Sequence, residues 1–478
     1  MIKKMIHTFR SLSAPKKSAI AFMLSSFIHQ GISFLVTPLF SRLLSTADFG
    51  LVTTYNSWTE MLAPLATLSL YSGFFNVGLL DYEDSRDPFV SATMGLASVS
   101  TLIVMTAVII IQLLWPNLVG IPVLMLLLMT LHFLFTPATR FWSARERFEF
   151  RYKRLFFVTV ATSLLTPVFG LVAVFLADSD LGTARLVGTN VAGIAVGVFF
   201  YITLTKKGKK FYDKKIWVSG LQFCIPLIPH YLAMHILSAS DRVMINNMTG
   251  SANAGIYGMA YTASMVVTVA WSAIHGSLTP YVLGKLKERK FQDIEKTSMQ
   301  CIMLFSGLCI FVCMVAPEVI YVLGGEKYAE SVDLLPPLFA AILFMEMYNL
   351  FSIVEFYHKK TKMVMLATVL AAVLNLILNA IAIPRFGYQV AAYTTLICYI
   401  MYCFFHYMNM RKIEPEKIYD WKKIVIFSVV YVVICLSCVF LYDYPILRYA
   451  LIVAVAVIAV LMRKRIMAMW SKMKRKSE

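Results

Sequence analysis

The sequence predicts an all-α integral membrane protein, and three observations lead to this fold class. First, 59% of the 478 residues are apolar and 15% are charged, whereas a soluble domain has roughly 45–50% apolar and about 25% charged residues. Second, the apolar residues gather in runs of the length that crosses a bilayer, which is about 20 residues for a helix. Third, Lys and Arg cluster in alternate segments between these runs, as the positive-inside rule describes.

About fourteen such runs are present along the chain. The first follows a basic segment, and it is too long for the apolar core of a cleaved signal peptide, so we expect it to be the first membrane helix. The predicted spans are 18–41, 50–72, 89–114, 119–139, 155–177, 183–205, 217–239, 255–278, 298–323, 334–356, 362–383, 389–410, 423–441 and 444–462.

The distribution of Lys and Arg orients these spans. With fourteen spans and a cytoplasmic N-terminus, most of the 44 Lys and Arg residues fall in cytoplasmic loops and in the two tails. This asymmetry predicts a multi-pass protein of the bacterial cytoplasmic (inner) membrane with both termini in the cytoplasm. The net charge of +18 then faces an anionic leaflet, and we expect no nucleic-acid partner.

The chain echoes itself at a spacing of about 200 residues. Arg42 follows the first predicted span and Arg242 the seventh, and an Ala-x-x-Gly pattern follows each arginine. Six spans separate the copies, and an even number gives the two halves the same orientation in the membrane. We therefore expect a parallel repeat of two six-helix lobes, 1–210 and 211–415, followed by two helices and a basic cytoplasmic tail, 416–478.

Polar side chains form stripes on the first two spans of each lobe, because residues three, four or seven positions apart share a helix face. Polar groups in hydrocarbon are costly, so a stripe faces a wet cavity or a neighbouring helix. We favour a cavity between the lobes that binds substrate, with interhelical hydrogen bonding as the alternative. The predicted substrate-binding residues are His29, Gln30, Ser33, Arg42, Ser57, Asp241, Arg242, Tyr257, Tyr261, Thr268 and His275.

Two acidic residues lie near the predicted bilayer centre, Glu60 and Glu346. A carboxylate at that depth must be protonated, paired or solvated. Coupling to H+ or Na+ and a purely interhelical pair both remain open. Glu355 lies closer to the cytoplasmic end, where we expect a boundary residue. No Cys-His spacing typical of a metal site is present, all eight cysteines fall inside apolar runs, and no cofactor is expected.

Several arginines are candidates for phosphate binding, because the guanidinium group presents a planar fork of donors. Arg42 and Arg242 stand at repeat-related outer positions, and snorkelling to lipid headgroups is the alternative. Arg140, Arg145 and Arg147 begin the predicted fourth loop, 140–154. They could capture a phosphorylated headgroup from the inner leaflet, although the positive-inside rule alone also explains them.

The turn from Arg42-Leu43-Leu44 to Phe49-Gly50 is similar to the signature of the polysaccharide transporters. So are Asn375 with Asn379, and the segments 383–387 and 391–395, although Gln389-Val390 stands where the family often shows a second glycine. The chain thus resembles the O-antigen and exopolysaccharide flippases of the multidrug/oligosaccharidyl-lipid/polysaccharide exporter superfamily.

This resemblance implies two six-helix lobes in a V around a central cavity. It also implies flipping of an undecaprenyl-pyrophosphate-linked oligosaccharide from the inner to the outer leaflet, by alternating access and often with cation coupling, for O-antigen, capsule or exopolysaccharide assembly. The implied partners are the lipid-linked glycan, membrane lipids, a polysaccharide polymerase and a chain-length regulator.

Two other function classes remain open. A multidrug/cation antiporter of the same fold needs a more acidic cavity, and Glu60 and Glu346 keep it in view. A membrane polysaccharide polymerase or ligase usually presents a sizeable outer loop. The longest predicted outer loop, 240–254, has about fifteen residues, so the sequence favours a transporter over an enzyme.

Overall fold

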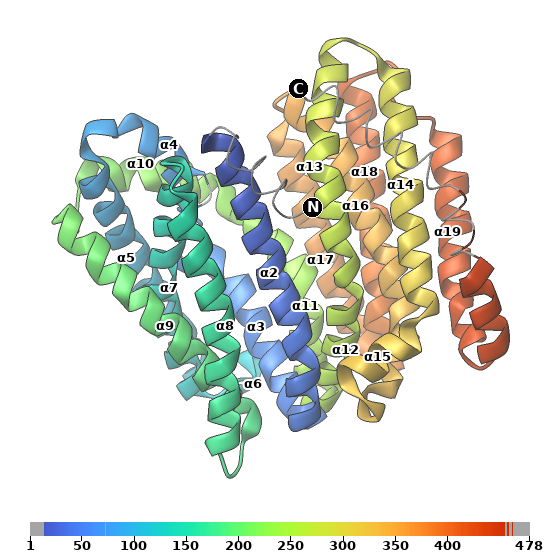
Figure 1. The fold of residues 1–478 in the computed structure, drawn as a ribbon, viewed down its shortest axis with the longest axis horizontal. Helices are drawn as coiled ribbons and strands as arrows, with labels where there is room; N and C mark the ends of the chain where they lie inside the picture. Colours follow the sequence, from blue (N-terminus) through green and yellow to red (C-terminus); the bar gives the residue numbers. More distant parts are fainter. Residues whose placement is uncertain (1–13, 72, 455–456, 458–460, 462–478) are drawn as a thin grey trace, which may run out of the picture. The chain divides into compact units, whose positions relative to one another are not determined.

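The computed structural model describes residues 14–71, 73–454, 457 and 461, and the regular secondary structure in this part of the chain is helical (Figure 1). Eleven of its helical segments are long and apolar enough to cross a membrane, and each coincides with a predicted span. The all-α membrane fold class is therefore confirmed. The other three predicted spans coincide with α2 (Ala14–Leu43), α3 (Thr46–Ala66) and the apolar helix Pro445–Ala454. The predicted N-terminal tail, the basic C-terminal tail and the end of the last span lie outside the described residues.

Contacts divide the chain into two compact units. Unit 1 comprises Met1–His235 with Gly250–Ala252, and unit 2 comprises Ile236–Thr249 with Asn253–Glu478. The boundary passes through one helix, α11 (Ile228–Thr249). The division into lobes at residues 210 and 415 stays a prediction.

Unit 1 is organised around helix α9 (Leu181–Gly208), which contacts four other long helices. Glycine allows close approach: a Cβ at Gly197 would lie 2.6 Å from the carbonyl oxygen of Phe135. Such small residues are typical of helix pairs in membranes. The partners of α9 are α3, α5 (Arg86–Leu114), α7 (Val123–Phe148) and α8 (Tyr152–Leu176), and α2 packs on α8; shorter elements are α4 (Phe74–Asp81), η1 (Glu83–Ser85), α6 (Pro116–Val119), α10 (Lys214–Cys224) and η2 (Ile225–Leu227).

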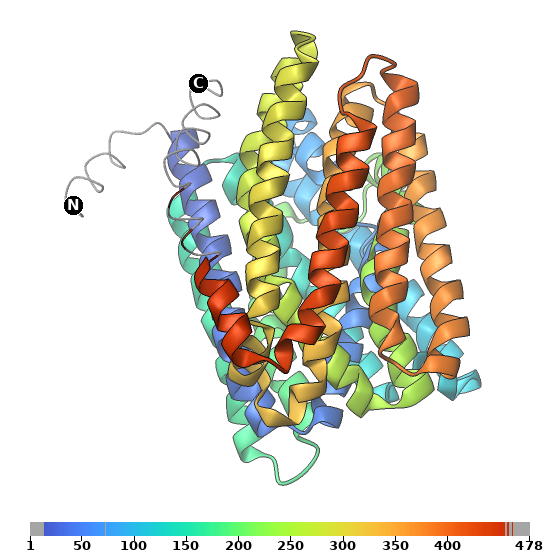
Figure 2. The same cartoon turned by 90° about the vertical axis from the view of Figure 1, so that its right-hand side faces the viewer.

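Unit 2 is organised around helix α16 (Leu335–Tyr357). In the most apolar 18-residue stretch of the span Glu326–Tyr357, 83% of the residues are buried. Helix α16 is therefore a core helix rather than a lipid-facing one. Helices α14 and α19 run side by side on one face of this unit (Figure 2). The helices that contact α16 are α13 (Val266–Lys287), α14 (Phe291–Met314), α17 (Thr361–Phe386), α18 (Val390–Ile413) and α19 (Trp421–Tyr442); shorter elements are α12 (Ser251–Ser264), α15 (Ala316–Gly324) and η3 (Glu326–Leu334).

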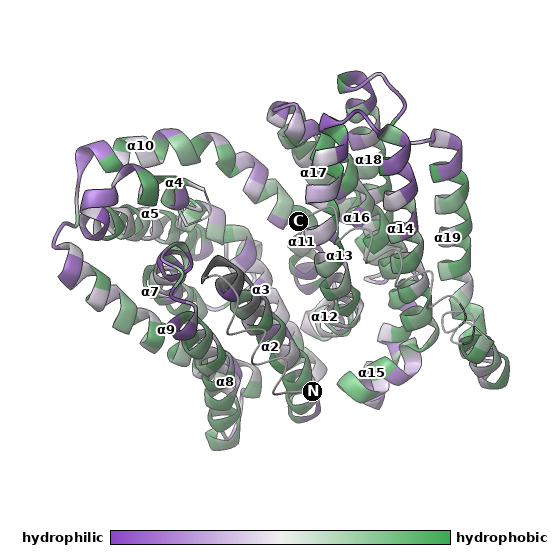
Figure 3. Ribbon diagram, turned by 45° about the horizontal axis from the view of Figure 1, so that its top comes forward, coloured by the Kyte–Doolittle hydropathy of each residue, from purple (hydrophilic) through white to green (hydrophobic). Residues whose placement is uncertain are grey.

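Hydropathy follows the helix axes within each unit. Helix α8 in unit 1 and helix α19 in unit 2 are hydrophobic along most of their length, and hydrophilic residues gather at helix ends and loops (Figure 3). All eight cysteines are buried and unpaired. They act as small apolar packing residues.

Two loops predicted from the sequence are helical. The predicted outer loop 240–254 is wrong, because α11 continues to Thr249 and α12 begins at Ser251. Gly250 alone separates them, with a φ of +98° that favours glycine. The predicted loop 140–154 is also mostly wrong, since α7 continues to Phe148 and α8 begins at Tyr152. In both cases a run of polar and charged residues suggested a loop but belongs to a helix end.

The motif after the first span is a helix cap. The Ser45 hydroxyl accepts a hydrogen bond from the Asp48 amide at 3.1 Å, and Asp48 Oδ2 accepts from the Ser45 amide at 3.2 Å. The second carboxylate oxygen accepts from the Gly182 amide at 3.1 Å. A Cβ at Gly182 would lie 2.9 Å from the Asp48 carbonyl oxygen, so glycine permits this approach. One carboxylate therefore joins the starts of α3 and α9.

We expect Asp48→Ala to lower the stability of the protein by about 1–2 kcal/mol, because it removes the cap and leaves the Gly182 amide without its acceptor. Thermal unfolding of the purified protein in detergent would show a lower Tm. Asp178→Ala removes an exposed carboxylate just before α9 and should leave the Tm unchanged. Equal Tm values for both variants would contradict the role of Asp48.

Candidate functional site

A buried carboxylate forms the most connected polar site of unit 2. Asp241 on α11 is 2% exposed. Its Oδ2 atom accepts hydrogen bonds from the Tyr257 hydroxyl at 2.8 Å and from the Thr395 hydroxyl at 2.6 Å. Its Oδ1 atom accepts from the Asn379 amide nitrogen at 2.6 Å. Three donors from α12, α17 and α18 thus hold one carboxylate inside the helix bundle.

A chain of amides and hydroxyls extends this site. Asn375 Oδ1 accepts from the Ser240 hydroxyl at 3.0 Å and from Asn379 Nδ2 at 3.2 Å. The Thr394 hydroxyl donates to Asn379 Oδ1 at 2.5 Å. The site therefore combines a carboxylate, two amide oxygens and hydroxyls. Oxygen ligands of this kind suit a hard cation, and a carboxylate can instead hold a proton. We call Asp241, Asn375, Asn379, Thr394 and Thr395 the oxygen cluster.

The structure places two predicted substrate residues inside this region. Asp241 and Tyr257 contact each other, and Tyr257 is fully buried, so neither forms an open surface in this conformation. Their substrate role stays a prediction. Asn379 and Thr395 were not predicted as site residues. The sequence does contain an indication of these two residues, because polar residues inside otherwise apolar spans need a partner.

Arg242 and Tyr261, both predicted for substrate, also lie together in unit 2. The Arg242 guanidinium lies over the Tyr261 ring, 4.3 Å from its centroid, and its Nη2 donates to the carbonyl of Ser238 at 2.8 Å. On α13, Thr268 donates to the Met265 carbonyl at 2.6 Å, and His275 is half-buried. These two residues therefore do not join the oxygen cluster.

Two acidic residues that the sequence analysis singled out, Glu346 and Glu355, are both buried on α16. Glu346 Oε2 accepts from the amide of Asn349 at 2.9 Å. The side chain of Glu355 is fully buried against His406 and Asn409 of α18. Its place at the membrane boundary stays a prediction. The partners come from another helix, and the local sequence does not specify them.

In unit 1, the predicted stripe residues of α2 and α3 do not all have the same environment. His29 Nδ1 lies 2.9 Å from the Ser163 hydroxyl of α8. Ser57 is fully buried and donates to the Thr53 carbonyl of its own helix at 2.8 Å. The exposed positions are those of His29, Gln30, Ser33, Arg42 and Glu60.

An aromatic and charged group in unit 1 surrounds Arg140. The Arg140 guanidinium lies over the Tyr71 ring, 4.7 Å from its centroid. His235 on α11 lies within electrostatic range of both Arg140 and Glu60. His235 was not predicted, since a single histidine in an apolar run gives little signal.

The remaining basic residues of α7 have other partners. Arg145 binds the carboxylates of Glu149, at 2.8 Å, and of Asp87. Arg147 lies over the Phe22 ring, 4.8 Å from its centroid. Arg145 is thus neutralised within the protein, and a role of these arginines in headgroup capture stays a prediction.

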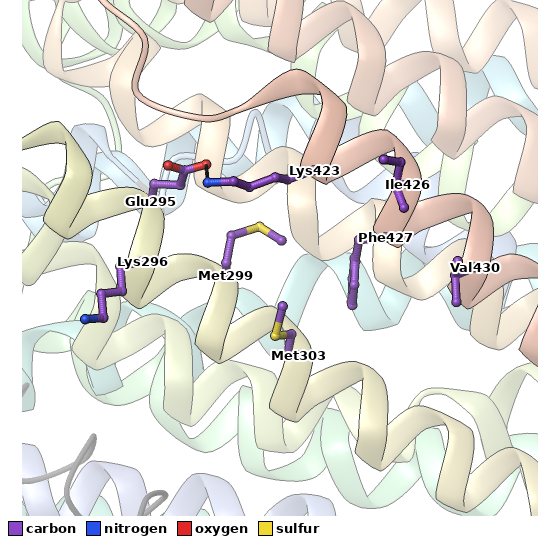
Figure 4. A pocket seen from close by; sticks show the side chains of 8 residues that line it. All are labelled: Glu295, Lys296, Met299, Met303, Lys423, Ile426, Phe427 and Val430. Carbon is purple, nitrogen blue, oxygen red and sulfur yellow. Dashed lines mark hydrogen bonds and ion pairs between the residues drawn. The ribbon is translucent and has the colours of Figure 1, made fainter.

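A groove of different character lies between α14 and α19 (Figure 4). Its volume is about 690 Å³, and an ion pair between Lys423 and Glu295, 3.3 Å apart, stands at one end. Met299, Met303 and Phe427 make most of its wall hydrophobic. Such a surface suits the hydrocarbon chains of lipids and not a polar headgroup.

Comparison with solved structures identifies the fold. The fold matches the lipid II flippase MurJ in an inward closed conformation with a TM-score of 0.65 and 14% identity, over 94% of this chain and all of MurJ. It matches an inward-facing multidrug resistance MATE family transporter of the MOP superfamily with a TM-score of 0.61 and 13% identity, over 83% of this chain and 96% of the transporter. The protein has the fold of MOP-superfamily membrane transporters.

Sequence comparison then gives the family. Residues 39–333 match the model of the polysaccharide biosynthesis protein family, so the chain belongs to this family. The Lsg locus protein 1 of Haemophilus influenzae is 23% identical over 226 residues, which cover 46% of this chain and 56% of the relative. An uncharacterized membrane protein of the same organism is 26% identical over 234 residues, with the same coverage. The matches thus span little more than half of each relative.

We expect Asn379→Leu to destabilise the protein by about 1.5–3 kcal/mol, because it removes a donor from the buried Asp241 carboxylate. Thermal unfolding in detergent measures the change. Asn247→Leu, at an exposed position near the end of α11, is the matched control and should behave like the wild type. A wild-type Tm for Asn379→Leu would show that Asp241 does not depend on this bond.

Proposed function

We propose that this protein flips an undecaprenyl-pyrophosphate-linked oligosaccharide from the inner to the outer leaflet of the bacterial cytoplasmic membrane. Membership of the polysaccharide biosynthesis family and a fold shared with transporters support a flippase rather than an enzyme. The glycan would serve O-antigen, capsule or exopolysaccharide assembly. A polysaccharide polymerase and a chain-length regulator would then act on it after transport.

One recurring observation carries the substrate class: each unit holds an arginine stacked on a tyrosine. Arg140 lies over Tyr71 in unit 1, and Arg242 lies over Tyr261 in unit 2. A guanidinium fork suits phosphate oxygens. The adjoining ring offers an apolar face to a sugar, with a hydroxyl at its edge. Each pair is therefore suited to a sugar attached to a phosphate.

The topology proposed for this function keeps both termini in the cytoplasm. The basic residues of the cytoplasmic loops and tails then meet the anionic leaflet on which the lipid-linked glycan is assembled. Alternating access would carry the headgroup past Arg140 and Arg242, while the lipid tail stays in the bilayer.

We expect Arg140→Ala and Arg242→Ala to lower flipping by about 10- to 100-fold each, which corresponds to the loss of about 1.5–3 kcal/mol of charged hydrogen bonding. The measurement is the appearance of the lipid-linked repeat unit in the outer leaflet of cells that express each variant in place of the wild type. Arg385→Ala is the control, since Arg385 is exposed and donates to Ile381 of its own helix. Unchanged glycan export in cells that lack the protein would refute the proposed function.

We assign cation coupling to the oxygen cluster in the same proposal. Asp241 is the only acid of the cluster, and amide and hydroxyl oxygens surround it. Either H+ or Na+ at Asp241 would neutralise a charge that the membrane interior disfavours. A cation that binds one conformation more tightly than another shifts the transport equilibrium toward that conformation.

Added Na+ or H+ should raise the Tm of the wild type, because a ligand that binds only the folded state stabilises it, by about 2.7 kcal/mol at a hundred times its Kd. The Asp241→Asn variant should lose the response to Na+, and K+ should not replace Na+. Glu346→Gln alters a buried acid that the sequence predicts for coupling. This variant should retain the response to Na+. A response lost in Glu346→Gln and kept in Asp241→Asn would move the coupling site to α16.

A multidrug/cation antiporter is the second candidate, because a MATE transporter shares the fold and Glu60 on α3 is exposed. An exposed acid in a membrane helix can attract a cationic drug. Efflux of cationic dyes from cells would favour this function, provided that glycan export does not depend on the protein.

A further inference from the structure

Glu355 and His406 form a buried acid–base pair that the oxygen cluster does not include. Their side chains are 0% exposed, and His406 Nδ1 lies 2.5 Å from Glu355 Oε2. Asn409 Nδ2 donates to the other carboxylate oxygen. The pair joins α16 to α18, the two helices at the centre of unit 2. Two titratable side chains are thus in contact with each other in the protein interior, out of contact with water.

The second ring nitrogen of His406 distinguishes this pair from a simple tie between helices. Nε2 is buried and has no hydrogen-bond partner among the described residues. Buried polar atoms are almost always satisfied, and an exception requires an explanation. With Nδ1–H donated to the carboxylate, Nε2 carries the lone pair, and this is the position at which an imidazole takes up a proton.

We propose that Glu355 and His406 are a second proton-binding site of unit 2, used in the transport cycle. A hydronium ion gives one proton to His406 Nε2: an O–H bond breaks, an N–H bond forms, a water molecule is left, and the imidazole becomes an imidazolium. The net charge of the pair changes from −1 to zero. Release returns the proton to water and restores the lone pair. Neutralising the pair offsets the cost of an unbalanced charge in the protein interior.

The groups that face the pair are aromatic and neutral. The Tyr402 ring meets the imidazole edge-on with centroids 4.6 Å apart, and the Tyr348 centroid is 5.3 Å away. Tyr402 in turn bonds Thr368 of α17 at 3.0 Å. Among the other titratable groups of the neighbouring helices, Glu346 binds Asn349, and Tyr431 of α19 donates to the Phe339 carbonyl. Cys313 of α14 lies against Tyr442, Tyr407 donates to the Tyr419 carbonyl, and His358 pairs with Glu414.

A groove lies beside the pair at the cytoplasmic end of α18, as the sequence orients it. This groove of about 470 Å³ between α17 and α18 is lined in part by Tyr402, Asn409 and Lys412. Asn409 therefore contacts both the groove and the Glu355 carboxylate. In the proposal, this side chain moves aside and water then reaches the pair. The proton would thus enter from the side that carries the positive charges.

Nitrogen NMR of the purified full-length protein labelled at histidine with 15N tests proton binding without any substrate. The His406 Nε2 signal should change from unprotonated to protonated as the pH falls from about 8 to about 5. Its assignment rests on its loss in His406→Gln, or on its displacement in Glu355→Gln if His406→Gln does not fold. Glu355→Gln should move the transition to lower pH, because the carboxylate that stabilises the imidazolium is gone. Ser298→Ala, which removes a different buried hydrogen bond of unit 2, to Tyr419, should leave it in place. A His406 Nε2 signal that stays the same across this range would overturn the proposal.

The use of that proton in transport rests on the proposed function, and a second measurement separates the two. Flipping of the lipid-linked glycan in vesicles would be compared with and without a pH gradient. Acceleration by the gradient is expected in the wild type and in Ser298→Ala, and at least a tenfold smaller effect, on the order of 1.4 kcal/mol, in Glu355→Gln. No flipping by the wild type would refute the proposed function, whatever the NMR result. Flipping by Glu355→Gln with an unchanged response to the gradient would refute the role of the pair.

Discussion

Hydrocarbon offers no hydrogen bonds, so nearly all the polar groups that these helices bury need a partner within the protein. This constraint explains the two most connected carboxylates of unit 2. Asp241 receives donors from three other helices, and Glu355 receives them from α18. The same constraint acts in unit 1, where His132 of α7 meets Asn190 of α9 at 2.9 Å and Ser98 of α5 meets Tyr201 of α9 at 3.1 Å. The polar bonds therefore lie between helices that are otherwise held by apolar packing.

Apolar contact alone does not select helix partners in a membrane, because lipid chains are as apolar as the side chains. Specific pairs here share a glycine contact or a buried polar bond. Gly197 brings α9 against α7, and the Glu355–His406 bond joins α16 to α18. At the helix ends, Asp48 joins the start of α3 to the start of α9 by accepting a hydrogen bond from the Gly182 amide. Similar apolar faces do not determine which helices pair, and these few contacts can do so.

The sequence predicted the helices well because the surrounding lipid requires a long apolar run in each spanning helix. Such a run can be recognised without knowledge of tertiary contacts. The prediction failed where polar residues continue a helix, at Asp241 and Arg242 and again at Arg140 to Arg147. It also did not identify the partner of Glu355, which lies 51 residues further along the chain. Some residues of the polar stripes contact other polar side chains, as His29 contacts Ser163 and Tyr261 contacts Arg242. The stripes did not show which stripe faces a cavity and which faces another helix, since both environments satisfy the same side chains.

The burial of all eight thiols has a practical consequence. A cysteine reacts with maleimide reagents through its thiolate in contact with water, and none of the native thiols meets that condition in the folded protein. Single cysteines introduced at loop positions would then be the sites that label, without prior removal of the native eight. The sidedness of each loop can therefore be mapped in intact cells on an otherwise unaltered chain.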